Sequence, residues 1–293
     1  MESTRLSPRV LWLATATLTI LGVVLRSVCM LTAFDTAVGY FHTGFLPSLS
    51  DALYFVAVAV AVVGASLIHK GVLSTELNTR LRLPAAYLWG FSLVAFTVGV
   101  MLTCYPNRTN DFLVAPMVLG VLSSFYFLAT KNKTGRYSDG LCALGFLPVV
   151  WCVAAAWETY TDLFTAMNSP IKISLQMGFL GLALILVSEL RFRLGKPLPR
   201  VAAALASIGV FLSLNGGIPI LLGTGARVLF NELHVFYAVV LLCGGIYGAY
   251  TLFQYLWFPA ETPAETATET ATETAVETAT EAPADPPETP NAE

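Results

Sequence analysis

The stretch VLWLATATLTILGVVLRSVCMLTA, residues 10–33, contains a single charged side chain, Arg26. A bilayer core about 30 Å thick is crossed by roughly 20 predominantly apolar residues in an α-helix. The stretch reaches that length. It also exceeds the apolar core of about 7–15 residues in a signal peptide, and it ends without a clear small-residue cleavage site. It therefore predicts a first transmembrane helix that is not cleaved.

Seven further apolar stretches follow, at residues 51–69, 84–104, 111–130, 139–158, 171–190, 201–222 and 234–257. Of the 293 residues, 56% are hydrophobic and 12% are charged, whereas roughly 25% of residues are charged in soluble domains. We predict an all-α fold, a polytopic transmembrane bundle of about eight helices over residues 1–257.

Basic residues occupy every second connection between these stretches. Twelve of the sixteen lysines and arginines follow this rule: Arg5, Arg9, Lys70, Arg80, Arg82, Lys131, Lys133, Arg136, Arg191, Arg193, Lys196 and Arg200. Positive charge near short spans stays on the cytoplasmic side during membrane insertion. The pattern therefore predicts that both termini are cytoplasmic and that four short connections face outward.

The segment 258–293 differs from the rest of the chain in composition. Glutamate recurs every four residues from 261 to 281, mainly between threonine and alanine, and prolines follow. In a helix this spacing would place like charges side by side, which is unfavourable. We predict a disordered, low-complexity acidic tail. It is either a spacer without a ligand or a docking segment for a basic protein partner.

The five cysteines, Cys29, Cys104, Cys142, Cys152 and Cys243, lie in or at the ends of apolar stretches and show no C-x-x-C spacing. We interpret them as small hydrophobic residues. A disulfide between Cys29 and Cys104, both near the outer face, is the alternative.

Motifs of several enzyme and binding classes are missing from the sequence. It contains no phosphate loop, no H-E-x-x-H zinc helix and no G-x-S-x-G nucleophile elbow. It has no basic patch with interleaved aromatic residues of the kind that binds nucleic acid. We therefore predict no catalytic residue, no metal, no cofactor and no nucleic-acid partner. The expected partners are the lipid bilayer and a small solute or ion, and a homo-oligomer is left open.

The candidate binding residues lie on the predicted outer side. They are Arg26, Asp35, His42, Glu158, Asp162, Glu232 and His234, with Asp51 close to the first connection. If the outer loops converge, the carboxylates and imidazoles form a cation or proton site, because an unperturbed imidazole titrates near pH ~6.5. Arg26 would then bind an anionic group or pair with an outer carboxylate. The plainer interpretation is ordinary loop residues, with Arg26 reaching the interface.

Two further patterns concern the helices themselves. Asn215, Gly216, Gly217 and Pro219 interrupt the seventh stretch and predict a break in that helix, a feature that transporters use to expose backbone groups. Gly244 and Gly248 have the G-x-x-x-G spacing of close helix contacts, either inside the bundle or at a dimer face. Glu189 and Arg193 are four residues apart and predict a structural contact near the inner headgroups.

The segment FDTAVGYF, residues 34–41, follows a first span that has an arginine near its end. It resembles segments of uncharacterised bacterial polytopic membrane proteins. The resemblance covers a small part of the chain and implies a multi-pass protein of the bacterial cytoplasmic membrane. It transfers no activity and no site.

Three functions fit the sequence. The first is a small-molecule or ion transporter, or a solute-binding membrane subunit, with its site near the outer face. The second is an accessory, sensory or assembly protein that docks through its acidic tail. The third is a membrane enzyme acting on lipid or quinone, which would require an acid–base or metal cluster within reach of the headgroups.

Overall fold

A computed structural model describes residues 6–69, 73, 79–104, 111–130, 137–163, 165–229 and 231–257, with only the backbone of 79–83 and 111. The chain divides into two units, Met1–Pro259 and Ala260–Glu293. The predicted tail, 258–293, lies outside the described residues, as do Arg5, Lys70, Lys131, Lys133 and Arg136.

The described residues of the first unit form eight α-helices, a 3₁₀ turn and a small hairpin. The helices are α1 (Pro8–Thr32), α2 (Phe45–Leu67), α3 (Thr79–Thr103), α4 (Val114–Ala129), α5 (Asp139–Thr161), α6 (Pro170–Arg193), α7 (Pro199–Gly225) and α8 (Glu232–Trp257). The turn η3 (Asp111–Leu113) precedes α4, and strands β1 (Phe34–Asp35) and β2 (Tyr40–Phe41) join α1 to α2. The predicted all-α polytopic fold is confirmed.

Seven of these helices are long and apolar enough to cross a membrane, and α4 is a shorter apolar helix. At 1.5 Å per residue α4 is about 24 Å long, and η3 adds about 6 Å. Together they reach the thickness of a bilayer core. The largest boundary error concerns α2, which begins at Phe45 and not at residue 51. Pro47 falls in its first turn, where a missing N–H is tolerated.

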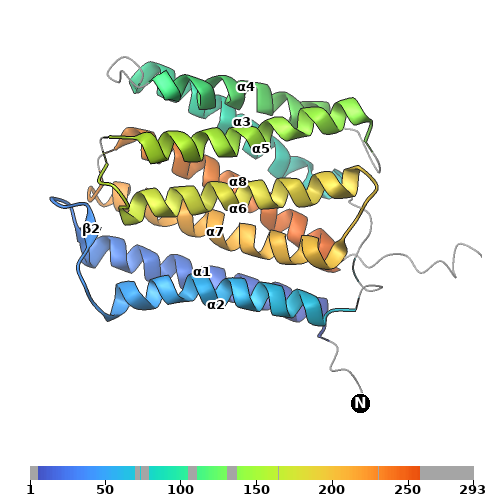
Figure 1. Cartoon of the computed structure of the whole chain (residues 1–293), viewed down its shortest axis with the longest axis horizontal. Helices are drawn as coiled ribbons and strands as arrows, with labels where there is room; N and C mark the ends of the chain where they lie inside the picture. The colour runs from blue at the N-terminus through green and yellow to red at the C-terminus, as the bar shows by residue number, and fades with distance from the viewer. Residues whose placement is uncertain are drawn as a thin grey trace, which may run out of the picture. The chain divides into compact units, whose positions relative to one another are not determined.

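Consecutive helices run antiparallel, so α1 begins and α8 ends at the same end of the bundle (Figure 1). We call this end the inner face, following the charge pattern, and the opposite end the outer face. Arg9, Arg191, Lys196 and Arg200 lie at helix ends or in a loop on the inner face. The β1–β2 hairpin and the connections after α5 and α7 lie at the outer face (Figure 1).

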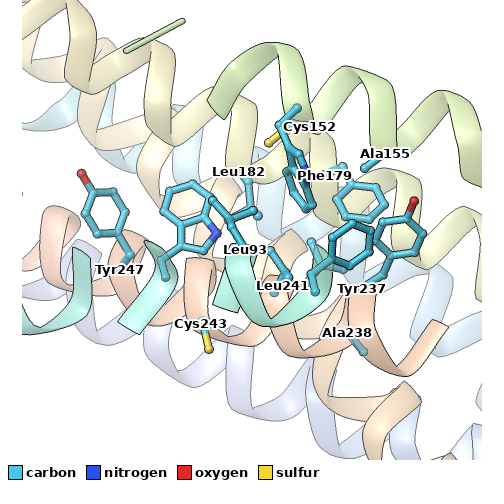
Figure 2. Packing of buried hydrophobic residues seen from close by; sticks show 14 of the residues in the cluster. Leu93, Cys152, Ala155, Phe179, Leu182, Tyr237, Ala238, Leu241, Cys243 and Tyr247 are labelled. Atoms are coloured by element: carbon cyan, nitrogen blue, oxygen red, sulfur yellow. The ribbon is translucent and has the colours of Figure 1, made fainter. Parts of the chain in front are cut away.

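Helix α7 joins two parts of the bundle. It contacts α1 and α2 on one side and α6 and α8 on the other. The largest buried cluster is built from α3, α4, α5, α6 and α8, with Trp89, Phe96 and Trp151 among its members. Figure 2 shows part of this cluster, in which Tyr237 and Tyr247 of α8 lie at opposite ends of an apolar interior. The α1–α2 pair packs through smaller clusters that include Leu11, Leu53 and Phe211.

The predicted break in the seventh helix is wrong, because α7 continues from Pro199 to Gly225 with Pro219 inside it. The glycines serve close packing instead. A Cβ atom at Gly216 would lie 2.6 Å from the Ser174 carbonyl oxygen of α6, and one at Gly217 would lie 2.7 Å from the Ala238 carbonyl oxygen of α8. Small residues let two backbones approach in this way. The two glycines therefore tighten the bundle.

The G-x-x-x-G pair of α8 also faces the interior. A Cβ at Gly244 would meet Leu182 at 2.6 Å, and one at Gly248 would meet Ile185 at 2.3 Å, so both glycines contact α6. Both are buried within one chain, and this excludes them from an exposed dimer face. The alternative of a Cys29–Cys104 disulfide is wrong as well, because both thiols are free.

Candidate functional site

Polar side chains gather at the outer face where α5 ends and α8 begins. His234 Nε2 lies 3.7 Å from Asp162 Oδ2, and the Thr165 hydroxyl donates to the same carboxylate oxygen at 2.8 Å. The Asn231 amide nitrogen lies 3.3 Å from His234 Nε2. Asp162 and His234 are only 2% and 4% exposed. Two residues that were predicted from separate connections thus share one buried cluster.

Lys172 of α6 enters this cluster from a third helix. Its Nζ donates to the backbone carbonyl of Asp162 and, at 3.4 Å, to that of Tyr160. Carbonyls at a helix C-terminus have no partner within the helix, and a cation there also interacts favourably with the helix dipole. Lys172 therefore satisfies carbonyls at the end of α5 and brings a buried positive charge, 4% exposed, to the backbone of Asp162.

Glu158 lies one turn before Asp162 on α5 and is completely buried. The Tyr237 hydroxyl of α8 donates to Glu158 Oε2 at 3.0 Å. The Tyr237 ring is stacked on Phe96, with centroids 4.9 Å apart, and meets Phe179 edge-on at 5.1 Å. Figure 2 shows Tyr237 and Phe179 within the apolar interior. The carboxyl group of Glu158 thus adjoins the aromatic core and lies below the Asp162–His234 pair.

These five side chains form what we call the outer acidic cluster: Glu158, Asp162, Lys172, His234 and Tyr237. It combines two carboxylates, one ammonium group, one imidazole and one phenol. Burying an ionised group costs several kcal/mol unless charges and hydrogen bonds compensate it. Polar and ionisable residues within a membrane protein are therefore functional candidates by default. Such groups can take up, hold and release a proton or another small cation.

Arg26 belongs to a second site on the other side of the first turns of α6. Its Nη1 donates to Asp51 Oδ1 of α2 at 3.0 Å. Its Nη2 donates to the Ser174 hydroxyl at 3.1 Å and to the Pro170 carbonyl at 3.3 Å. Phe41 of the hairpin lies with its ring centroid 4.7 Å from the guanidinium carbon. Arg26 is only 3% exposed and is held by neighbouring elements of the bundle.

Three predicted site residues lie apart from both groups. Asp35 closes a turn in the hairpin, because its carboxylate accepts the backbone N–H groups of Ala37 at 2.8 Å and Val38 at 3.3 Å. His42 and Glu232 are exposed, in the connection before α2 and in the first turn of α8. The expected convergence of all outer acids and imidazoles is therefore wrong for these residues. Neighbouring positions in sequence placed them on the correct face but not in a common site.

A buried carboxylate also lies toward the inner face. Glu189 of α6 is completely buried, and it accepts hydrogen bonds from the hydroxyls of Tyr126 at 3.2 Å and Tyr247. Arg193 Nε lies 3.8 Å from Glu189 Oε1, and the guanidinium group lies over the Tyr137 ring. The predicted i,i+4 contact is present. Both side chains are buried within the bundle, and α8 supplies a tyrosine to Glu189 as it does to Glu158.

A groove of about 480 Å³ runs along α5 and α6 next to the outer acidic cluster. Its lining includes Trp157, Tyr160, Gln176 and Leu180. Trp157, Tyr160 and Leu180 are more than half exposed, as expected of side chains that contact lipid. Glu158 and Asp162 face the interior on the same helix end, so the groove and the cluster lie on different faces of α5.

Comparisons with protein-family models, curated proteins and solved structures found no match. Among the residues that the structure describes, no group of three or more histidine, cysteine, aspartate or glutamate side chains is arranged to hold a metal ion. The interpretation of the site therefore depends on its own geometry and chemistry.

The sequence prediction missed Lys172, Tyr237, Thr165 and Asn231, which complete the cluster. Lys172 had one usable signal, because it is a base on the outer side, where the positive-inside pattern disfavours bases. The sequence gives no such signal for Tyr237, because a tyrosine in an apolar stretch is compatible with the membrane interface and with the protein core.

Proposed function

We propose that this protein transports a small solute or ion across the bacterial cytoplasmic membrane, and that Glu158 and Asp162 take up the coupling cation, a proton, from the outer side. The observation that carries the proposal is the complete burial of Glu158 against Tyr237, one turn below the Asp162–His234 pair. A proton is the ligand that such a buried carboxyl group can accept without a larger cavity.

A purely structural role would not require an ionisable group at residue 158. Glutamine has nearly the same shape, and its amide oxygen can accept the same tyrosine hydrogen bond without a buried charge. Perturbed, buried titratable groups cluster at functional sites. The position of Glu158 near the outer face, with Asp162 and His234 above it, gives a proton a short path to it through titratable side chains.

Purified protein in liposomes with a trapped pH-sensitive dye tests the proposal. A potassium diffusion potential should drive proton entry through the wild type, and Glu158→Gln should abolish it, whereas Glu158→Asp should retain part of it. Glu232→Gln is the matched control, because it removes an exposed carboxylate from the same face and should leave the flux unchanged.

Equal flux in the wild type and in a folded Glu158→Gln protein would refute the assignment of Glu158. A wild-type protein that conducts no protons would refute the coupling cation. The accessory alternative depends on the acidic tail, outside the described residues. It would gain support if a pull-down with the tail recovered a specific protein while the wild type showed no proton flux in liposomes.

A further inference from the structure

Arg26 and Asp51 form an ion pair with very unequal surroundings. The side chain of Arg26 is 4% exposed, whereas that of Asp51 is 66% exposed. The ion-pair contact joins Arg26 Nη1 to one carboxylate oxygen of Asp51 at 3.0 Å. A buried cation is therefore neutralised by a carboxylate that lies on the surface.

The remaining surroundings of the guanidinium group are fixed by the fold. Nη2 is bound to Ser174 and to the Pro170 carbonyl of α6, and the rings of Phe41 and Tyr54 lie 4.7 and 5.9 Å from its carbon atom. Arg26 Nε is buried and has no hydrogen-bond partner in the part of the chain that the structure describes. Aromatic rings and α6 thus hold the group in place, and Asp51 covers the side toward the surface of the bundle.

We propose that Arg26 is a binding site for an anionic group, a carboxylate or a phosphate, and that Asp51 occupies the position of this group when no ligand is bound. The planar guanidinium fork matches the geometry of both anions. Asp51 is 66% exposed, so its carboxylate can be hydrated when it leaves, and the incoming anion then supplies the charge that compensates the buried Arg26. The proposal does not rest on the outer acidic cluster, because α6 separates the two sites.

The anion can come from a soluble solute or from a lipid headgroup, and two probes distinguish these sources. Inorganic phosphate is titrated by calorimetry into detergent-purified protein. The lipid source is tested with nanodiscs that contain either phosphatidylglycerol or phosphatidylcholine, with thermal stability as the measurement. Binding of phosphate indicates a solute site, and stabilisation only by phosphatidylglycerol indicates a lipid site.

Asp51→Asn should strengthen anion binding by up to about fivefold, because the competing carboxylate is removed. Arg26→Gln should abolish it. Asp35→Asn is the matched control: it removes a negative charge from the same face, and asparagine can keep the turn that Asp35 forms. It should leave binding at the wild-type level.

A gain of affinity in Asp51→Asn is informative even if Arg26→Gln does not fold. Equal effects of Asp51→Asn and Asp35→Asn on anion binding would mean that binding depends only on the overall electrostatic potential of the outer face. This result would overturn the proposal. Loss of stability in Asp51→Asn without any gain in binding of either probe would also overturn it, because the pair would then be structural. None of these results changes the expected proton flux through Glu158.

Discussion

Tyr237 and Tyr247 of α8 place their hydroxyls on two buried carboxylates, one toward each end of the bundle. Tyr237 binds Glu158 and Tyr247 binds Glu189. The two tyrosines are ten residues apart, or about 15 Å along the helix. The surroundings of the glutamates differ, because Glu189 has Arg193 within 3.8 Å on its own helix, whereas Glu158 is followed one turn later by a second acid, Asp162. The Arg193 contact predicts that Glu189 contributes to the stability of the bundle.

Removing Arg193 should therefore destabilise the protein strongly. In Arg193→Met the carboxylate of Glu189 loses its compensating charge in a fully buried site, and breaking such a pair costs ~3–5 kcal/mol. The measurement is the free energy of unfolding in mixed micelles. Arg191→Met is the control, because Arg191 is exposed two residues away and its loss should have almost no effect. The double variant Glu189→Met/Arg193→Met should recover most of the loss, and a failure to recover would contradict an ion-pair role.

Residue chemistry indicated which side chains were candidates but not their partners. Arg26 and Glu158 stood out in the sequence as charged groups inside or at the end of apolar stretches, and both are buried among polar partners. The partners come from distant positions. Ser174 is 148 residues from Arg26, and Tyr237 is 79 residues from Glu158. Such contacts depend on how helices are rotated against each other, which apolar length alone does not encode.

At the scale of single elements, α6 and α7 approach each other through glycine. A Cβ at Gly209 would lie 2.5 Å from the Gly181 carbonyl oxygen, and one at Gly181 would lie 2.9 Å from the Gly209 carbonyl oxygen. Because both obstacles are backbone atoms, neither helix can yield by a change of rotamer. The pair brings Ser174 and Lys172 of α6 into the positions that both outer sites use.

Gly209→Ala should force these helices apart. Overpacking of this kind costs typically ~1–3 kcal/mol, and the shift of α6 should also reduce proton flux through the outer acidic cluster. Gly140→Ala in α5 is the matched control, because no atom lies within 4 Å of the added Cβ and alanine favours a helix by up to ~1 kcal/mol. Thermal unfolding of the two variants checks the difference. Equal stability of both would contradict the close α6–α7 contact.

The same reasoning explains why the predicted break of α7 is absent. Glycine and proline can have either of two effects in a membrane helix. They can interrupt the helix, or they can allow a neighbouring helix to approach closely. Gly216 and Gly217 face backbone atoms of α6 and α8. Which effect occurs depends on the neighbouring helices, and these helices cannot be identified from a single apolar stretch of sequence.

At the scale of the whole molecule, the predicted orientation can be tested with chemistry that the chain leaves available. All five natural cysteines are buried, so background labelling by a membrane-impermeant maleimide should be low. His42 is exposed on the outer face, and Lys196 is exposed on the inner face. In intact cells His42→Cys should be labelled and Lys196→Cys should not, and permeabilisation should expose Lys196→Cys. The reverse result would invert the assignment of inner and outer faces.

The sequence by itself determined the class of the protein and the number of its helices. The length of each apolar stretch is set by the thickness of the bilayer, and the distribution of lysine and arginine is set by membrane insertion. Both features therefore depend on local sequence. Only the tertiary structure decided that the outer polar residues form two sites on either side of α6, that Lys172 and Tyr237 complete one of them, and that Asp35, His42 and Glu232 belong to neither. Which side chains contact each other depends on how the helices are rotated and on close packing at glycine. Both are established only when segments distant in sequence pack together.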